Sequence, residues 1–298
     1  MTAALYALRY GKDVVVIEKG GFGGQITHSP RVDNYPGILS MSGNEFAEKL
    51  LDQILQQGAQ IEFETVTKIR EIPADGSKPR HFEVETEEGE TREAKAVILA
   101  TGVRHRTLGL PQEEELTGEG ISYCAVCDGD FYAGKTVCVV GGGDAALQEA
   151  ILLSEKCREV IVLHRRKEFT AEQKLQEILA ARSNARKIMQ VKITKLLTDA
   201  KGDFCGVETE STEDKSTGTI CCDGLFVSIG QIPENDAFRP VADLDERGYF
   251  DADEHCLTRT PGVFTAGDCR QKEIRQLTTA TGDGAVAALA ACRYIDRL

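Results

Sequence analysis

Two cysteines separated by two residues, Cys124 and Cys127, have the spacing of reactive thiols. A C-x-x-C pair is either a redox-active disulfide or half of a zinc site. The zinc site needs a second Cys or His pair at ligand spacing, but Cys221 and Cys222 are adjacent and the five histidines are isolated from other ligands. The pair therefore favours redox chemistry. Asp128, directly after the second thiol, is a candidate proton donor or acceptor for a thiolate, provided that burial raises its pKa.

A nucleotide-binding pattern follows the cysteine pair. Residues 136–146 are predicted to form an apolar strand, a glycine turn and the start of a helix. Within them Gly141, Gly143 and Ala146 satisfy the G-x-G-x-x-A pattern in the strand-turn-helix context that it requires. A dithiol just before such a site suggests that electrons pass from a nucleotide to a disulfide.

The next apolar strand, residues 160–163, ends in the basic run His164, Arg165 and Arg166. A site for NAD usually carries an acid at this place, which bonds the ribose. Arginines there suit the 2′-phosphate of NADP, because guanidinium holds a phosphate in a fixed fork. The structural alternative is a solvated basic turn.

Taken together, these motifs carry a resemblance to a known family. The runs Cys124 to Gly129, Gly141 to Ala146 and His164 to Arg166, followed by Thr265-Ala266-Gly267-Asp268, occur in the order seen in the low-molecular-weight, bacterial-type thioredoxin reductases. The chain resembles this family over nearly its whole length. The resemblance implies a flavoenzyme that passes electrons from NADPH through FAD to the Cys pair and on to thioredoxin or a similar redoxin.

The resemblance also implies roles for individual residues. Cys127 is the thiol that faces the flavin, Cys124 attacks the partner disulfide, and Asp128 is the acid/base. The implied NADPH contacts are Gly141, Gly143, Asp144, Ala146, His164, Arg165 and Arg166. The implied FAD contacts are Glu18, Gly23, Gly24, Gln25, Asn34, Val66, Thr101, Gly102, Gly267, Asp268, Arg275, Gln276 and Leu277. Relatives are homodimers in which the nucleotide domain rotates against the flavin domain.

Two of the implied flavin contacts have structural alternatives. The glycine cluster at residues 20–24 could be a flexible surface loop, although its place after a predicted parallel strand favours ligand contact. The carboxylate of Asp268 could instead cap a helix that starts soon after it.

The chain begins in the middle of a nucleotide-binding unit. Residues 2–11 are predicted to be the back half of a helix ending at a glycine, and residues 13–18 a buried parallel strand ending in the acid Glu18. The strand and glycine fingerprint that precede this helix in the family, and that hold the FAD pyrophosphate, do not occur in the sequence. The flavin domain is therefore expected to be N-terminally incomplete.

Periodicity predicts the remaining elements. Helices are expected at 42–57, with a capping box from Ser42 and Glu45, and at 282–291. Strands are expected at 61–66, 81–84, 96–102, 191–197, 204–209 and 220–229, with a loop at 73–77. The fold class is predicted to be α/β with two Rossmann-like nucleotide-binding domains, the NAD(P) domain being inserted into a discontinuous FAD domain. The expected boundaries are 1–107 and 235–298 for the FAD domain and 108–234 for the NAD(P)H domain.

Composition bounds the class of protein. With 298 residues, 41% hydrophobic and 28% charged, the chain is an ordinary globular protein with room for two domains. The net charge of −13 argues against nucleic acid or an anionic membrane as partner. We find no apolar run of spanning length and no basic signal-peptide region, so the cytoplasm is the expected compartment. The cysteines outside the pair are expected to be small core residues, namely Cys138, Cys157, Cys205, Cys256, Cys269 and Cys292.

One departure from the family leaves the electron donor open. The pattern usually has a further arginine after Phe169, where this chain has Thr170. A reductase of another redoxin, fed by NADH or ferredoxin, is therefore an alternative. A second alternative is a non-catalytic flavoprotein-like binding module, because the pyrophosphate fingerprint provides much of the cofactor affinity.

Overall fold

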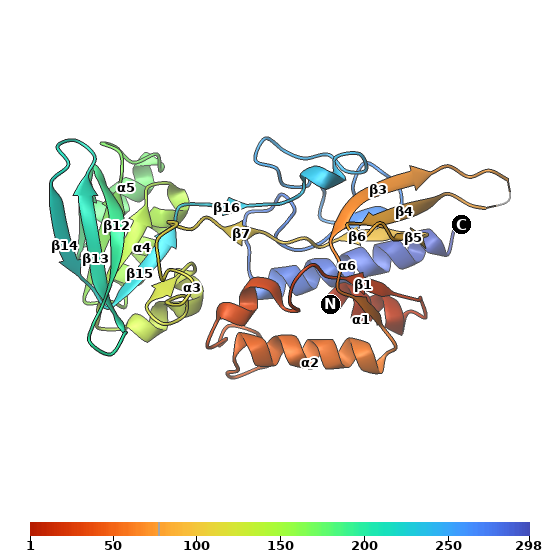
Figure 1. Ribbon diagram of the computed structural model, residues 1–298, viewed down its shortest axis with the longest axis horizontal. Coiled ribbons are helices and arrows are strands. Elements are labelled where there is room, and N and C mark those ends of the chain that lie inside the picture. Colours follow the sequence, from red (N-terminus) through yellow and green to blue (C-terminus); the bar gives the residue numbers. More distant parts are fainter. Residues whose placement is uncertain (77) are drawn as a thin grey trace. The chain divides into compact units, whose positions relative to one another are not determined.

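The computed structural model describes residues 1–76 and 78–298, which form two compact units (Figure 1). Unit 1 combines Met1–Thr27, Tyr35–Arg104 and Ile232–Leu298, whereas unit 2 combines His28–Asn34 with His105–Gln231. Unit 1 is thus built from both ends of the chain, and unit 2 is inserted between them. Where the chain passes between the units, the short strands β7 (Arg104–His105) and β16 (Gln231–Ile232) pair with each other. Ser77, in the predicted loop 73–77, lies outside the described residues.

Unit 2 is organised around a five-stranded parallel sheet of order β11-β10-β9-β15-β8. The strands are β8 (Ile121–Ser122), β9 (Thr136–Gly141), β10 (Glu159–His164), β11 (Ala185–Met189) and β15 (Gly224–Ser228). Successive side chains of a strand point to opposite faces. Val137 and Val139 of β9 accordingly join one core and Cys138 joins another. The apolar strands are therefore buried on both faces, as is usual for parallel sheets.

Helices cover the face of this sheet that carries Val137 and Val139. They are α3 (Ala125–Asp128), the 3₁₀ helix η2 (Gly129–Tyr132), α4 (Asp144–Ser154) and α5 (Gln173–Ala180). Leu147 and Leu153 of α4 and Leu179 of α5 pack with Phe226 of β15 in one apolar core.

A second sheet covers the other face. It is antiparallel, of order β12-β13-β14, and its strands are β12 (Val191–Thr198), β13 (Phe204–Ser211) and β14 (Thr217–Cys221). The single strand predicted at 220–229 is wrong, because β14 ends at Cys221 and β15 begins at Gly224 in the parallel sheet. Asp223 forms this corner: its N–H donates to the carbonyl of Thr136, and its Oδ2 accepts the Thr136 N–H, each at 2.8 Å.

Most cysteines expected in the core are buried, but Cys205 is exposed. The pairing of β12 with β13 shifts register between Leu197 and Thr198, opposite Gly206 and Phe204. Such an irregularity leaves one residue unpaired and redirects its side chain. Cys205 is the residue skipped, and this explains why it does not join the core.

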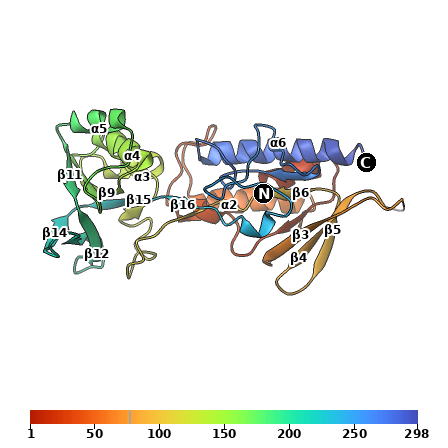
Figure 2. The same cartoon turned by 90° about the horizontal axis from the view of Figure 1, so that it is seen from above.

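Unit 1 contains two parallel strand pairs and one antiparallel sheet. The pairs are β1 (Val15–Ile17) with β2 (Gln60–Glu62) and β6 (Val97–Leu99) with β17 (Val263–Thr265). Figure 2 shows the antiparallel sheet of β3 (Val66–Ile72), β4 (His81–Thr86) and β5 (Thr91–Ala94). With the parallel sheet of unit 2, this architecture confirms the predicted α/β class.

Three helices complete unit 1, namely α1 (Thr2–Arg9), α2 (Gly43–Gln56) and α6 (Leu277–Ile295), with 3₁₀ turns η1 (Gly24–His28) and η3 (Asp236–Phe238). α1 packs on α6, where Ala7 meets Ala288 and Cys292. Small residues allow this close approach of two helices.

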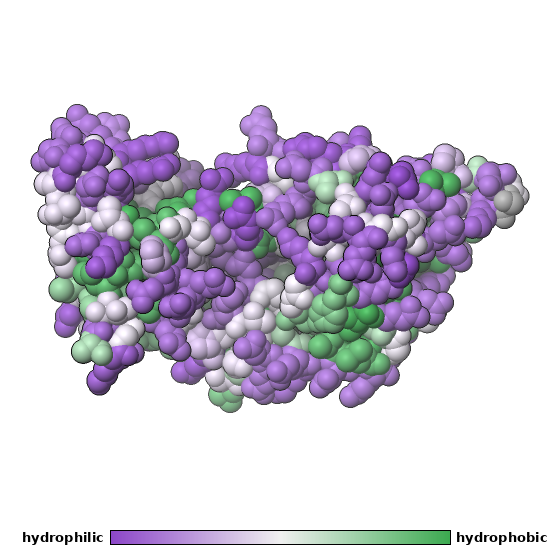
Figure 3. All heavy atoms as spheres, viewed as in Figure 1, coloured by the Kyte–Doolittle hydropathy of each residue, from purple (hydrophilic) through white to green (hydrophobic). Residues whose placement is uncertain are grey.

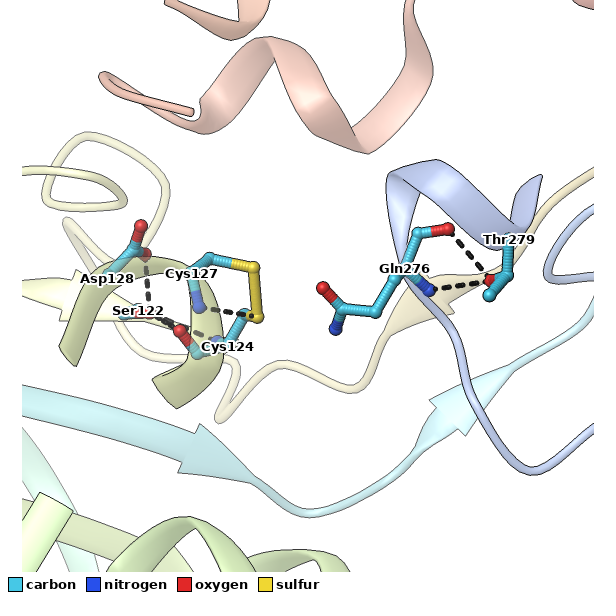
Figure 4. Close-up of a disulfide and its surroundings, with 6 residues drawn as sticks. All are labelled: Ser122, Cys124, Cys127, Asp128, Gln276 and Thr279. Atoms are coloured by element: carbon cyan, nitrogen blue, oxygen red, sulfur yellow. Dashed lines mark hydrogen bonds between the residues drawn. A yellow bond between two sulfur atoms is a disulfide. The ribbon is translucent and has the colours of Figure 1, made fainter. Parts of the chain in front are cut away.

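Side-chain caps mark the N-terminal ends of α2 and α6. Ser42 Oγ accepts the Glu45 N–H at 3.1 Å, as predicted, whereas the Glu45 carboxylate pairs with Lys49 at 2.6 Å. α6 begins at Leu277, five residues before the predicted start. Its capping box is formed by Gln276 and Thr279, whose Oγ1 accepts the Gln276 N–H at 3.1 Å (Figure 4).

The surface shown in Figure 3 is largely hydrophilic, as expected from the share of charged residues. Across residues 1–76 and 78–298, no helix is both long enough and apolar enough to span a bilayer. Over that same part of the chain, no three His, Cys, Asp or Glu side chains form a cluster suited to a metal ion.

Candidate functional site

Cys124 and Cys127 form a disulfide at the start of α3, with their Cα atoms 5.3 Å apart (Figure 4). Cys124 is the N-cap residue of this one-turn helix, and its Sγ accepts the Cys127 N–H at 3.2 Å. Both cysteines are partly exposed, and the side chain of Val126 between them is 56% exposed. The disulfide is therefore partly accessible to solvent.

Asp128 lies directly behind the disulfide and is buried. Ser122 Oγ donates to its Oδ2 at 2.6 Å and also accepts the Cys124 N–H at 3.1 Å, so one hydroxyl links the carboxyl group to the cysteine (Figure 4). Burial raises the pKa of Asp128, although the Ser122 bond opposes this. Oδ1 of Asp128 is buried without a hydrogen-bond partner in the described chain. A carboxyl group that holds its proton at higher pH suits the acid/base role predicted for it.

A second carboxyl group, that of Glu149, lies near Ala125, the first residue of α3. It projects from α4, and burial raises its pKa to about 7. Hydrogen bonds from the Ala125 N–H and the Ser228 hydroxyl oppose this rise but are outweighed by burial. Its Oε2 atom is buried and has no hydrogen-bond partner in the described part of the chain. Sequence reasoning missed Glu149, because α4 is apolar around most of its circumference and its pattern does not show which face is buried.

The glycine turn between β9 and α4 is closely packed. A Cβ on Gly141 would lie 2.3 Å from the Ser228 carbonyl oxygen and 2.5 Å from the Ala146 Cβ. A Cβ on Gly142 would lie 2.2 Å from the His164 ring. At Gly143, by contrast, the nearest atom is Thr170 Oγ1 at 3.8 Å. The first two glycines are therefore required by the protein itself, and the third leaves backbone accessible.

Gly143 is the N-cap of α4, and no side chain caps this end of the helix. The first N–H groups of a helix lack intrahelical acceptors and favour an anion. Asp144 Oδ1 accepts the Glu172 N–H at 2.7 Å, and its contact with the nucleotide stays a prediction. The arrangement suits a pyrophosphate held by backbone N–H groups rather than by side chains.

The basic run after β10 divides into a buried and an exposed part. His164 is buried, lies against Gly142, and has Nε2 3.1 Å from the Glu168 carbonyl oxygen. Its ring packs directly against the glycine turn. Arg165 and Arg166 are exposed, and neither forms an ion pair with any acid among the described residues. Two guanidinium groups without an acidic partner among the described residues, at the end of a parallel strand, suit an anionic group.

In unit 1 two of the predicted flavin residues, Gly267 and Asp268, form the turn that follows β17. Asp268 is buried enough that desolvation raises its pKa, and its Oδ1 has no hydrogen-bond partner in residues 1–76 and 78–298. Since α6 begins only at Leu277 and is capped by Gln276, Asp268 is not the cap of this helix.

Asp283 of α6 holds this turn. Its Oδ2 accepts the Gly267 N–H at 3.0 Å, Arg270 Nε at 2.8 Å and Lys272 Nζ at 3.0 Å, and its Oδ1 accepts Arg270 Nη2 at 2.8 Å. Burial opposes ionisation, but the bonds from Arg270 and Lys272 lower the pKa of Asp283. Lys272 Nζ also lies 3.7 Å from Asp268 Oδ1. The network fixes the turn and places a positive charge beside Asp268.

A second network links the ends of strands β6 and β17. Thr101 Oγ1 donates to Asn235 Oδ1 at 2.7 Å, and Asn235 Nδ2 donates to the carbonyls of Gly248 and Cys269 at 2.9 Å each. Asn235 is fully buried. The structure thus joins Thr101 to the turn after β17 through a residue that the sequence analysis did not select.

The other predicted flavin residues of unit 1 line these turns or the loop after β1. Glu18 Oε1 accepts the Gly20 N–H at 2.9 Å, and the Gln25 side chain donates to the Val103 carbonyl. Arg275 lies over the Tyr249 ring at 4.2 Å, just before Gln276 and Leu277 at the start of α6. A Cβ on Gly23 would lie 2.7 Å from the Ala47 Cβ, whereas Gly24 and Gly102 have open space at this position. Val66 begins β3.

Asn34, the remaining predicted flavin residue, falls in unit 2 with the short segment His28–Asn34. Its contact with the flavin stays a prediction.

Comparison with known proteins places these two units in a family. The sequence profile of the pyridine nucleotide-disulphide oxidoreductases matches residues 1–284. A thioredoxin reductase of Listeria innocua is 39% identical over 298 residues, covering 100% of this chain and 91% of the relative. A thioredoxin reductase of Bacillus subtilis is 35% identical and is covered to 92%. The chain belongs to the pyridine nucleotide-disulphide oxidoreductases, and among them to the thioredoxin reductases.

The fold agrees with this family. The crystal structure of thioredoxin reductase from Streptococcus pyogenes superimposes with a TM-score of 0.92 at 36% identity, and the match covers 100% of this chain and 94% of that one. Thioredoxin reductases carry FAD and use NADPH, and the residues described above fit both groups. The uncapped start of α4 and the unpaired arginines suit a dinucleotide phosphate, and the unpartnered Oδ1 of Asp268 suits a hydroxyl donor.

Three residues of these networks were missed by sequence reasoning, namely Glu149, Asn235 and Asp283. A signal existed for Asp283, because it is flanked by glycines in a helix otherwise composed of small and apolar residues. A lone charge in such a helix is expected to be paired when it is buried.

Proposed function

We propose that this chain is a thioredoxin-disulfide reductase that uses NADPH and FAD. One observation carries the proposal: a disulfide on α3 and a glycine turn leading into α4 lie in one unit, and the two helices are packed together. FAD, when bound, supplies a two-electron carrier between the nicotinamide and the disulfide. The proposal assigns NADPH to unit 2, predicted as residues 108–234, and FAD to unit 1, predicted as residues 1–107 and 235–298.

The protein's own residues account for the thiol chemistry. Two electrons and two protons break the Cys124–Cys127 bond and give two thiols, one proton passing through Asp128. Cys124 Sγ, as thiolate, then attacks a sulfur of the thioredoxin disulfide, which forms a mixed disulfide and releases one thioredoxin thiol. Cys127 attacks Cys124, so that the internal disulfide re-forms and the second thioredoxin thiol leaves. The net result is a reduced thioredoxin and an oxidised Cys124–Cys127 pair.

Replacement of Cys124 by Ser tests this assignment. We expect C124S, loaded with FAD, to be reduced by NADPH as fast as the wild type, because the nucleotide residues are intact. Turnover of thioredoxin should fall at least about 10³-fold, since the attacking thiol is lost. The measurements are flavin bleaching by stopped-flow absorbance and NADPH oxidation with excess thioredoxin.

The matched control is Cys205→Ser, which removes an exposed free thiol of the same unit. This variant should retain both rates. Wild-type turnover in C124S would contradict the assignment of the Cys pair.

The donor, the assembly and the compartment are further parts of the proposal. Support for NADPH comes from Arg165 and Arg166, while Thr170 favours a direct comparison with NADH and ferredoxin in steady-state assays. We also propose a homodimer in the cytoplasm, by the resemblance to relatives. A monomer in light scattering at assay concentration would contradict the dimer.

A further inference from the structure

Position 170 contributes no charge to the nucleotide site. The N–H of Thr170 donates to the Gly142 carbonyl at 2.8 Å, and its hydroxyl donates to the same carbonyl at 3.1 Å. Both bonds close the loop that follows β10 onto the glycine turn. Thr170 thus holds the loop, whereas an arginine at this place would add a cation to the site.

A cation reaches the same loop from the neighbouring strand. Lys187 of β11 is the register partner of Val162 in β10, whose next residues lead into the basic run. Its Nζ lies 5.8 Å from the centroid of the Phe169 ring, and this ring in turn lies 5.4 Å from the His164 ring. Lys187 is exposed and forms no ion pair with an acid in the described chain. Its ammonium group therefore lies at the ring of Phe169, in the segment that follows Arg165 and Arg166 in sequence, and no acid of the described residues neutralises it.

We propose that Lys187 supplies the third positive charge of the 2′-phosphate site and is a specificity-determining residue for NADPH over NADH. The proposal rests on the proposed function, because it concerns the nucleotide of that reaction. An ammonium on a flexible stem can rest against an aromatic face and turn toward a phosphate as a point charge. NADH lacks the 2′-phosphate, so Lys187 should distinguish the two nucleotides.

The neighbouring residue provides a matched control. Arg186 carries the same charge on the same strand, but its Nε pairs with Glu159 Oε1 at 2.7 Å. Since successive residues of a strand point to opposite faces, Arg186 lies away from the loop. Loss of Arg186 removes one positive charge without removing the proposed contact.

The experiment measures the dissociation constants of NADP⁺ and NAD⁺ by isothermal titration calorimetry on the FAD-loaded protein. K187A should weaken NADP⁺ by about 3–10-fold and NAD⁺ by less than about twofold, as expected for one charge pair at a partly exposed site. K187R should restore NADP⁺ binding to within about twofold. R186A should leave both constants unchanged within about twofold.

A double variant tests whether a positive charge at position 170 can replace the one at position 187. In the K187A background, Thr170→Arg should recover the affinity for NADP⁺ but not for NAD⁺, because the arginine restores the missing charge. A thermal melt of each variant, with a midpoint near that of the wild type, establishes that the fold is retained.

Two outcomes would overturn the assignment of Lys187. They are an unchanged NADP⁺ constant in folded K187A and an equal weakening of both nucleotides. A wild-type protein that binds neither nucleotide would instead overturn the proposed function itself.

Discussion

The nucleotide end of unit 2 and the turn after β17 in unit 1 are held by different forces. In unit 2 the glycine turn is closed by backbone: the Gly142 carbonyl accepts the N–H groups of Thr170 and Ala171, and the His164 ring fills the space beneath. In unit 1 the turn at Gly267 is held by Asp283, whose carboxylate bonds Arg270 and Lys272. The first arrangement depends on shape and the second on buried charge.

This difference determines which change damages each unit. A backbone-closed turn tolerates changes of charge but not an added carbon atom, since interiors are close-packed. A buried ion network tolerates neither the loss of a partner nor its neutralisation, because the remaining charges have lost their hydration. A substitution that alters only volume should therefore destabilise unit 2 more, and one that alters only charge should destabilise unit 1 more.

Asp283→Ala should have the largest effect. The side chains of Asp283 and Arg270 are 12% and 13% exposed, so the substitution leaves buried cations unpaired and should cost about 3–5 kcal/mol of unfolding free energy. Urea denaturation of the FAD-free protein measures this loss. We also expect weaker FAD binding, because the Gly267 N–H loses its acceptor.

The control for this prediction is Lys49→Ala, which breaks an exposed ion pair on α2 of the same unit. An exposed ion pair contributes little to stability, because water screens both charges. A loss in Asp283→Ala as small as that of the control would show that the network does not hold unit 1.

Gly142→Ala should have the next largest effect and should act on unit 2. The new Cβ would lie 2.2 Å from the ring of His164, which is buried and has no room to move, so a cost of about 2 kcal/mol is expected. Gly143→Ala is the matched variant, since nothing lies closer than 3.8 Å to its Cβ. Equal stability losses in the two variants would argue against close packing as the force that holds this turn.

The pH dependence of stability should give the smallest effect, with opposite signs in the two units. In unit 2 burial raises the pKa of Glu149 from 4.5 to about 7. Protonated Glu149 therefore contributes fully to the unfolding free energy below pH 4.5, and this contribution is lost as pH rises to about 7. The reason is that Glu149 loses its proton at a lower pH in the unfolded chain than in the folded one. We expect a loss of about 1–2 kcal/mol, less than the full shift would give, since partial solvation reduces it.

Glu149→Gln isolates this contribution. His105 of unit 2, whose pKa is lowered to about 4 by burial, acts in the opposite direction as pH falls below 6.5, so the difference between the variant and the wild type is the quantity to measure. In unit 1 the lowered pKa of Asp283 predicts stability that is lost as pH falls below its ordinary value of 3.8. Urea midpoints from pH 3 to 8 test both signs, and a wild-type slope in Glu149→Gln would contradict the first.

The parts that sequence could predict are those whose physics is local. The glycine turn of unit 2, the cysteine pair and the cap at Ser42 each depend on residues within a few positions of one another. The strand at 220–229 could not be divided correctly, because both of its halves are apolar and the corner is made by Asp223 bonding to Thr136 in a distant segment. For the same reason the burial of Glu149 Oε2 was not foreseen, since Ala125 and Ser228 lie far from it in the sequence. The exposure of Cys205 depends on a register shift opposite Leu197 and Thr198, which the alternation of residues does not reveal.

The candidate site divides in the same way. His164 was predicted as a nucleotide contact because it belongs to a basic run, and this contact stays a prediction. It is the last residue of the apolar strand β10, and its ring lies buried against Gly142. Asn235 and Asp283 belong to no local motif, and only tertiary structure brings them to Thr101 and Gly267. Contacts of this kind stay beyond single-sequence reasoning, because their partners are separated by loops of any length.

The packing of α1 on α6 has a consequence for the order of folding during synthesis. α1 precedes α6 by all of unit 2 in the sequence, so α1 has no partner helix until α6 has been synthesised. Unit 2 has all but one short segment in the continuous stretch His105–Gln231, so it can fold while unit 1 is still incomplete. Contacts between segments so far apart in sequence also close a large loop and form slowly. The disulfide unit would therefore be in place before the turn at Gly267 acquires Asp283, and the newly made protein would gain its thiol site before its flavin site.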